Sequence, residues 1–61
     1  MNTKEIDTKI ENLYNTINEL KKTKMQRRKD GKDLYYVKLE ITKTRTEIQI
    51  LSYQRKLANN N

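Results

Sequence analysis

Two apolar stripes, separated by the only glycine of the chain, constrain its fold more than any other feature. One stripe begins at Ile6 and the other at Leu34. Within each stripe, successive positions lie alternately three and four residues apart. That interval is the heptad repeat of helices that pack side by side. The expected intrachain core consists of Ile6, Ile10, Leu13, Ile17, Leu20, Leu34, Val37, Ile41, Ile48 and Leu51.

Gly31 marks the place where the chain is expected to reverse. A glycine directly after a basic helical segment is the usual helix stop, because glycine adopts the left-handed conformation at little cost. Folding the chain back about Gly31 places Leu20 opposite Ile41 and Ile10 opposite Leu51, and the residue numbers of each such pair have the same total. The two stripes are therefore in register for an antiparallel hairpin.

These patterns predict an all-α, coiled-coil-like, two-helix antiparallel hairpin that forms a single domain over residues 1–61. Asn2 and Glu5 have the spacing of a capping box, so the first helix is expected over about 3–29. A turn follows at 30–32. Asp33 is expected to cap the second helix, over about 33–58, and the asparagines at 59–61 form a tail.

The main alternative for residues 34–44 is a β-strand. Tyr35, Val37, Leu39 and Ile41 alternate with more polar neighbours, and β-branched residues are dense from 37 to 50. A strand in a hairpin needs a turn after it. Residues 42–46 contain no glycine, asparagine, aspartate or proline to make one. The pattern therefore favours a helix.

A second stripe runs along the other side of the second expected helix. Its positions are Tyr36, Leu39, Lys43, Thr46, Ile50, Tyr53 and Leu57. The first helix has no matching stripe, so a lone hairpin would leave an apolar strip in water. We expect Tyr36, Leu39, Ile50, Tyr53 and Leu57 to form a dimer or partner face. A homodimer would be a four-helix bundle, and the alternative is docking into a groove of a different protein.

The small size of the chain also favours a homodimer. A chain of 61 residues buries only a small core, and such scaffolds usually add a disulfide, a metal or a second copy. The sequence contains no cysteine and no histidine, which excludes disulfides and the commonest ligands of transition metals. A second copy is the stabilising device that remains.

Positive charge is concentrated before the turn. Residues 21–32 contain one acidic residue, Asp30, and seven basic residues. We call these seven the basic tip: Lys21, Lys22, Lys24, Arg27, Arg28, Lys29 and Lys32. Compensation of the helix dipole explains two or three cations at a C-terminus. The remaining cations indicate an anionic partner. The candidates are nucleic acid, an acidic protein surface and anionic lipid. Tyr35 and Tyr36 are candidates for stacking on bases, although tyrosine is also ordinary at a helix start.

Features of an enzyme are missing from the sequence. The only serine, Ser52, has no histidine to activate it, and Gly31-Lys32 lacks the glycine-rich loop of a phosphate-binding motif. Asp7 and Glu11 lie one helical turn apart and are best read as a solvated face. We expect no catalysis, no cofactor, no metal and no small-molecule substrate.

Composition also suggests where the protein acts. No apolar run resembles a secretory signal or a membrane span, so a cytoplasmic location is expected. The first and last residues, Met1 and Asn61, suggest a complete small gene product, and richness in lysine, asparagine and isoleucine is typical of AT-rich genomes, such as those of phages and other mobile elements. For a phage protein, the location would be the cytoplasm of the host cell.

The hairpin layout resembles Rop, a plasmid protein that dimerises into a four-helix bundle and binds paired RNA. This resemblance is one of architecture, and it implies a nucleic-acid-binding hairpin as one function. A second group of helical hairpins, the sporulation-type aspartyl-phosphate phosphatases, needs a Ser-Gln-Glu-Leu-Asp motif that residues 46–50 do not carry. The favoured function is a non-catalytic regulatory adaptor or inhibitor, acting on a host or defence protein if it is phage-encoded.

Overall fold

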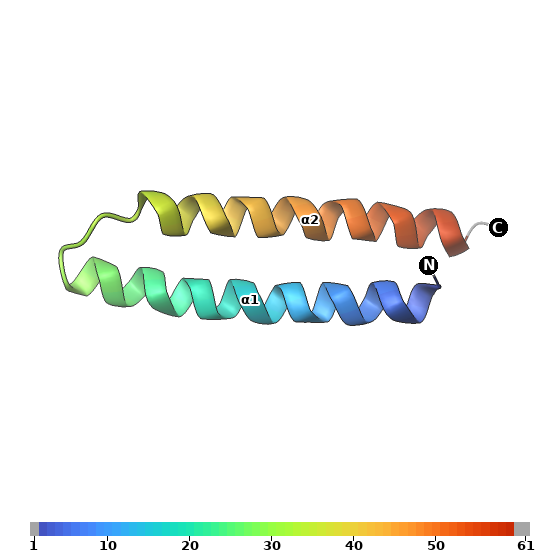
Figure 1. The fold of residues 1–61 in the computed structure, drawn as a ribbon, viewed down its shortest axis with the longest axis horizontal. Helices are drawn as coiled ribbons and strands as arrows, with labels where there is room; N and C mark the ends of the chain where they lie inside the picture. Colours follow the sequence, from blue (N-terminus) through green and yellow to red (C-terminus); the bar gives the residue numbers. More distant parts are fainter. Residues whose placement is uncertain (1, 60–61) are drawn as a thin grey trace.

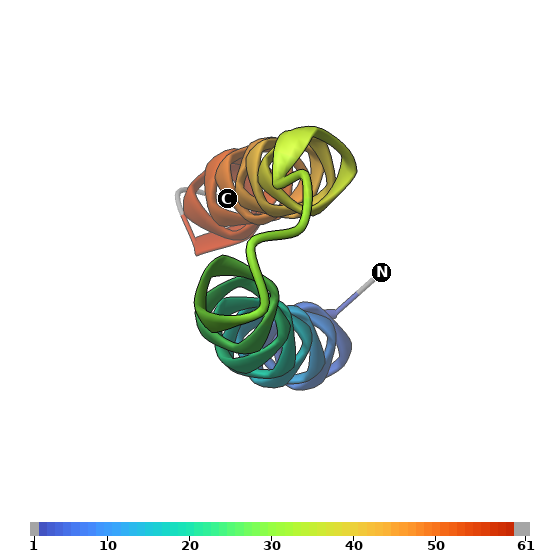
Figure 2. The same ribbon diagram turned by 90° about the vertical axis from the view of Figure 1, so that its left-hand side faces the viewer.

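The computed structural model describes residues 2–59, which form two helices and the turn that joins them. Helix α1 spans Thr3–Lys29 and α2 spans Tyr35–Asn59. The helices lie side by side and antiparallel, with the turn at one end of the rod and the chain ends at the other (Figure 1). The rod measures 50 × 15 × 12 Å, a single layer of two helices (Figure 2). The predicted all-α hairpin is confirmed, and the strand alternative for residues 34–44 is wrong.

Helix α1 begins at the residue that its cap predicts. The Asn2 side chain accepts a hydrogen bond at 2.9 Å from the backbone N–H of Glu5, one of the donors that a helix start leaves without a partner. Glu5 also places a negative charge in the first turn, where the helix dipole favours it. Asn2 and Glu5 therefore fix the start of α1 locally.

The turn ends α1 in the way that the position of Gly31 predicts. Gly31 has a φ of 69°, in the left-handed region. Its N–H donates to the carbonyl of Arg28 at 3.2 Å, and the Lys32 N–H donates to the carbonyl of Arg27 at 2.9 Å. These two bonds make a Schellman motif, which satisfies carbonyls that would otherwise lack donors.

Gly31→Ala is expected to destabilise the protein by about 1 kcal/mol, because an L side chain is strained in the left-handed region. A Cβ at this position would meet no atom within 4 Å, so the effect isolates backbone strain from steric overlap. Thermal unfolding followed by circular dichroism measures the change. An unchanged melting temperature would show that the turn relaxes without cost.

Helix α2 begins later than the sequence predicts, at Tyr35 rather than near residue 33. Asp33 still assists the start, since its carboxylate accepts a hydrogen bond at 3.0 Å from the Tyr35 N–H. Its carbonyl accepts a second bond, at 2.8 Å, from Nε of Arg27. This bond ties the segment after the turn to the end of α1. Helix α2 also runs on to Asn59, the first residue of the predicted tail, and residues 60–61 lie outside the described residues.

The core lies along the predicted seam. The buried residues are Ile6, Ile17, Ile41, Thr44 and Ile48. The other predicted core residues, Ile10, Leu13, Leu20, Leu34, Val37 and Leu51, are partly buried. Thr44 is the one buried polar residue within residues 2–59, and its hydroxyl is satisfied because it donates to the carbonyl of Glu40 at 2.8 Å. Of the ten predicted core residues, four are therefore buried and six are partly buried.

An ion pair also joins the two helices. Nε of Arg55 lies 2.6 Å from a carboxylate oxygen of Asp7. This pairing differs by one residue from the register that the apolar stripes predict. Both side chains are about half exposed, so solvent screens the pair and its contribution is small, at roughly 1 kcal/mol or less. The apolar seam therefore sets the alignment.

Candidate binding surfaces

The predicted second stripe forms an exposed surface of α2, here called the outer face: Tyr36, Leu39, Lys43, Thr46, Ile50, Tyr53 and Leu57. Its five apolar or aromatic side chains are between 48% and 73% exposed. A shallow groove of about 500 Å³ runs over its C-terminal half, between Thr46 and Leu57. The outer face is thus a long apolar strip that the hairpin itself does not cover.

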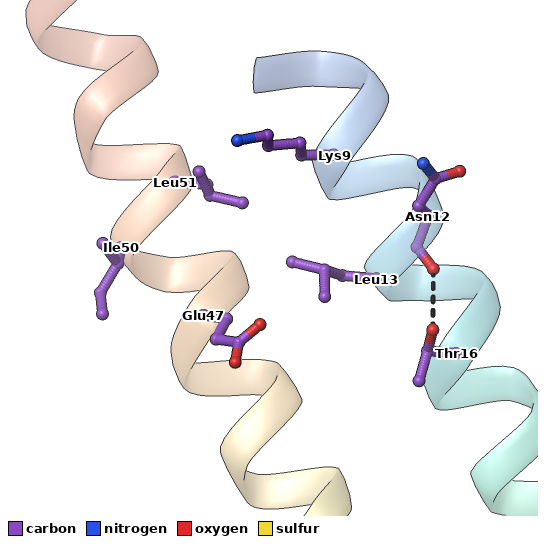
Figure 3. Close-up of a pocket in the computed structure, with 7 residues that line it drawn as sticks. All are labelled: Lys9, Asn12, Leu13, Thr16, Glu47, Ile50 and Leu51. Carbon is purple, nitrogen blue, oxygen red and sulfur yellow. Dashed lines mark hydrogen bonds between the residues drawn. The ribbon is translucent and has the colours of Figure 1, made fainter. Parts of the chain in front are cut away.

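Helix geometry explains why α1 cannot cover this strip. Successive side chains turn by about 100°, so Ile50 lies on the far side of α2 from Ile48. Figure 3 shows Leu51 pointing toward Leu13 of α1, while Ile50 points away from α1. Ile50 also borders a groove of about 440 Å³ between the helices. Apolar surface therefore continues from the outer face round to one side of the hairpin.

Helix α1 carries no equivalent strip. Its exposed large apolar residues are Tyr14 and Met25, at 54% and 63% exposure, and they stand apart from each other on the helix. The asymmetry between the helices that the sequence predicts is present in the structure.

The basic tip occupies the turn end of the rod, but its members differ in their surroundings. Lys24 and Arg27 are partly buried, and Nε of Arg27 is engaged by the carbonyl of Asp33. Nζ of Lys22 lies 3.5 Å from Oε1 of Glu19, and both side chains are about three-quarters exposed. The remaining residues of the tip, Lys21, Arg28, Lys29 and Lys32, are exposed. Arg27 therefore has a structural part in the turn that its sequence position did not reveal.

Two basic residues of α2 join the tip from across the hairpin. A groove of about 250 Å³ is lined by Lys21, Lys24, Lys38, Ile41, Thr42 and Arg45. Neither Lys38 nor Arg45 was among the residues predicted from sequence. The signal that would have found them is the antiparallel register, which sets the residues around 38–45 of α2 beside those around 17–24 of α1.

A second groove continues from the first. It has a volume of about 290 Å³ and is lined by Tyr14, Ile17, Asn18, Lys21, Arg45, Ile48 and Gln49. Lys21 and Arg45 border both grooves, so the two grooves lie next to each other along this side of the hairpin. We call the two grooves the basic channel.

The two tyrosines at the start of α2 contact each other. The ring centres of Tyr35 and Tyr36 lie 5.3 Å apart, and the ring planes meet at 81°, an edge-to-face arrangement. Both rings are more than 60% exposed. Their stacking on bases stays a prediction.

Some kinds of site are missing from the part of the chain that the structure describes. Residues 2–59 contain no group of three or more acidic, cysteine or histidine residues that could hold a metal ion. Neither α1 nor α2 is long and apolar enough to cross a membrane.

Comparisons with protein-family models, with curated proteins and with solved structures found no match to this chain.

Proposed function

We propose that this chain is a non-catalytic binding protein, a small regulatory adaptor or inhibitor. It pairs with a second copy through the outer face of α2 and engages a macromolecule with an anionic surface through its basic end. The observation that carries the proposal is the outer face, whose apolar side chains are about half exposed or more. Isolated apolar side chains are common on surfaces, whereas several large ones that recur along one face of a helix mark an interaction site.

The size of the core supports a second copy as the occupant. Within residues 2–59, four apolar side chains are buried, all of them isoleucines. Covering the exposed part of each large side chain on the outer face would contribute roughly 1 kcal/mol. The strip could therefore add several kcal/mol per chain to a domain whose own core is small.

The outer face is also complementary to itself. An antiparallel pairing that sets Thr46 against Thr46 of the second copy brings Leu39 against Tyr53 and places Tyr36 within one residue of Leu57. Each aromatic ring then meets a leucine, and the small residue lies at the centre. This arrangement places the two α2 helices in the middle and the two basic ends at opposite ends of the assembly. Repulsion between the tips is thereby minimised.

The experiment for this proposal is to measure molar mass and melting temperature over a range of concentrations. Sedimentation equilibrium is expected to give twice the chain mass of 7.4 kDa at micromolar concentration. The melting temperature is expected to rise with concentration, because mass action stabilises a folded dimer. A well-folded monomer up to about 100 μM would refute self-association and leave the outer face open to a different protein.

A further inference from the structure

We propose that the basic channel binds single-stranded nucleic acid, with phosphates along Lys21, Lys24, Lys38 and Arg45 and a base against Tyr14. This inference deepens the proposed function, because it names the anionic partner and the place where it binds. It does not depend on dimerisation, since every residue of the channel belongs to one hairpin.

The charge of the channel points to an anionic ligand. Four basic side chains from both helices line it, and no carboxylate is among the residues that line either of its grooves. The two ion pairs found within residues 2–59 involve other cations, Lys22 and Arg55. Cations held together without counter-charges repel one another, and an anion that lies between them relieves this repulsion.

The shape of the channel fits an extended chain of charges better than a single ion. Its lining runs along α1 from Tyr14 to Lys24, ten residues further on, which is about 15 Å at the helical rise of 1.5 Å per residue. The opposite wall, on α2, runs from Lys38 to Gln49. A groove with cations spaced along this length can follow several successive phosphates of a strand.

The uncharged lining favours a single strand over a duplex or an acidic protein. The ring of Tyr14 is about half exposed at one end of the channel, next to the amides of Asn18 and Gln49. Unpaired bases stack on such rings and expose edges that amides can bind, whereas the bases of a duplex are already stacked and paired. An acidic peptide offers no base to stack on the ring.

The test uses the full chain and a fluorescently labelled 12-nucleotide oligouridylate, with anisotropy measured over a series of salt concentrations. The double variant Lys38→Gln/Arg45→Gln is expected to weaken binding at least tenfold at 100 mM salt. Each phosphate contact on a single strand contributes about 0.7 to the slope of log affinity against log salt. The slope should therefore become shallower by about 1.4.

A matched control removes the same charge elsewhere. Lys4→Gln/Lys56→Gln takes one exposed lysine from each helix at the far end of the rod. It is expected to change affinity less than threefold, and circular dichroism checks that both double variants remain helical. Equal weakening by the two double variants would overturn the channel, since net charge alone would then explain binding.

Tyr14→Leu isolates the base contact. It is expected to weaken oligouridylate binding at least fivefold and to leave the salt slope unchanged, because no cation is lost. A 12-base-pair duplex that binds more tightly than the single strand, or polyglutamate that binds equally well, would overturn the single-strand assignment. If the chain is monomeric but binds the oligonucleotide, only the proposed dimer is refuted. If it is dimeric but does not bind the oligonucleotide, only the proposed role of the basic channel is refuted.

Discussion

Ile17→Asp is expected to abolish the helical fold at every protein concentration. Ile17 is 4% exposed and lies in the seam between α1 and α2. The substitution removes a buried apolar side chain, at a cost of about 2–5 kcal/mol, and leaves a carboxylate with little access to water. A domain of this size has little stability in reserve, because whole domains are stable by about 5–15 kcal/mol.

Asn15→Asp is the matched control for this substitution. It introduces the same charge two residues away on α1, at an exposed position that points away from the seam. Its effect on stability should stay within about 0.5 kcal/mol. Far-UV circular dichroism at 25 °C separates the two variants. A helical spectrum for Ile17→Asp would mean that the isoleucine seam does not hold the hairpin together.

The seam could be predicted from the sequence for a physical reason. Helical periodicity depends on the spacing of residues along one segment, and the positions that repeat at three and four must face one side. The antiparallel register then follows from the place of Gly31, since the chain can reverse there at little cost. The seam and the turn could therefore be predicted because each depends on local sequence alone.

The start of α2 could not be predicted in the same way. Aspartate is a residue type that commonly caps helices, but the carbonyl oxygen of Asp33 accepts a hydrogen bond from Arg27, six residues earlier. That contact holds the chain outside the helix for two more residues, and the carboxylate of Asp33 reaches the Tyr35 N–H from there. A bond across the turn is visible only once the turn is built.

The basic channel cannot be predicted from the distribution of charge along the chain, because its basic residues come from two segments that only the fold brings together. Lys38 and Arg45 lie in a segment of mixed charge and do not stand out in the sequence. The fold brings them beside Lys21 and Lys24, so the positive surface extends well beyond the segment before the turn. Applying the register to charged residues, and not only to apolar ones, would have revealed the cluster.

The outer face could be predicted as apolar and exposed, but its occupant depends on a second molecule. Its pattern nevertheless predicts an orientation. In the antiparallel pairing, Ile50 lies within one residue of Lys43 of the second copy, whereas in a parallel pairing Ile50 lies against Ile50. Charged substitutions at this one position therefore distinguish the two arrangements.

Ile50→Lys is expected to abolish the dimer, and Ile50→Asp to retain much of it. In the antiparallel arrangement the new lysine meets Lys43 of the second copy and is repelled, twice per dimer, whereas the new aspartate meets the same lysine and is attracted. In a parallel arrangement both variants place like charges together, and both should be monomeric. Each remains a folded hairpin, because Ile50 is 53% exposed and lies outside the intrachain core.

Sedimentation equilibrium of both variants, at matched concentration and low salt, measures the difference. The dissociation constant is expected to rise at least a hundredfold for Ile50→Lys, since it loses apolar burial and gains repulsion. For Ile50→Asp we expect a rise nearer tenfold, which grows with salt as the attraction is screened. Adding Lys43→Asp to Ile50→Lys reverses the charge pair and should restore association. Equal loss in all three variants would exclude the antiparallel pairing and leave a parallel dimer or a different protein as the occupant of the outer face.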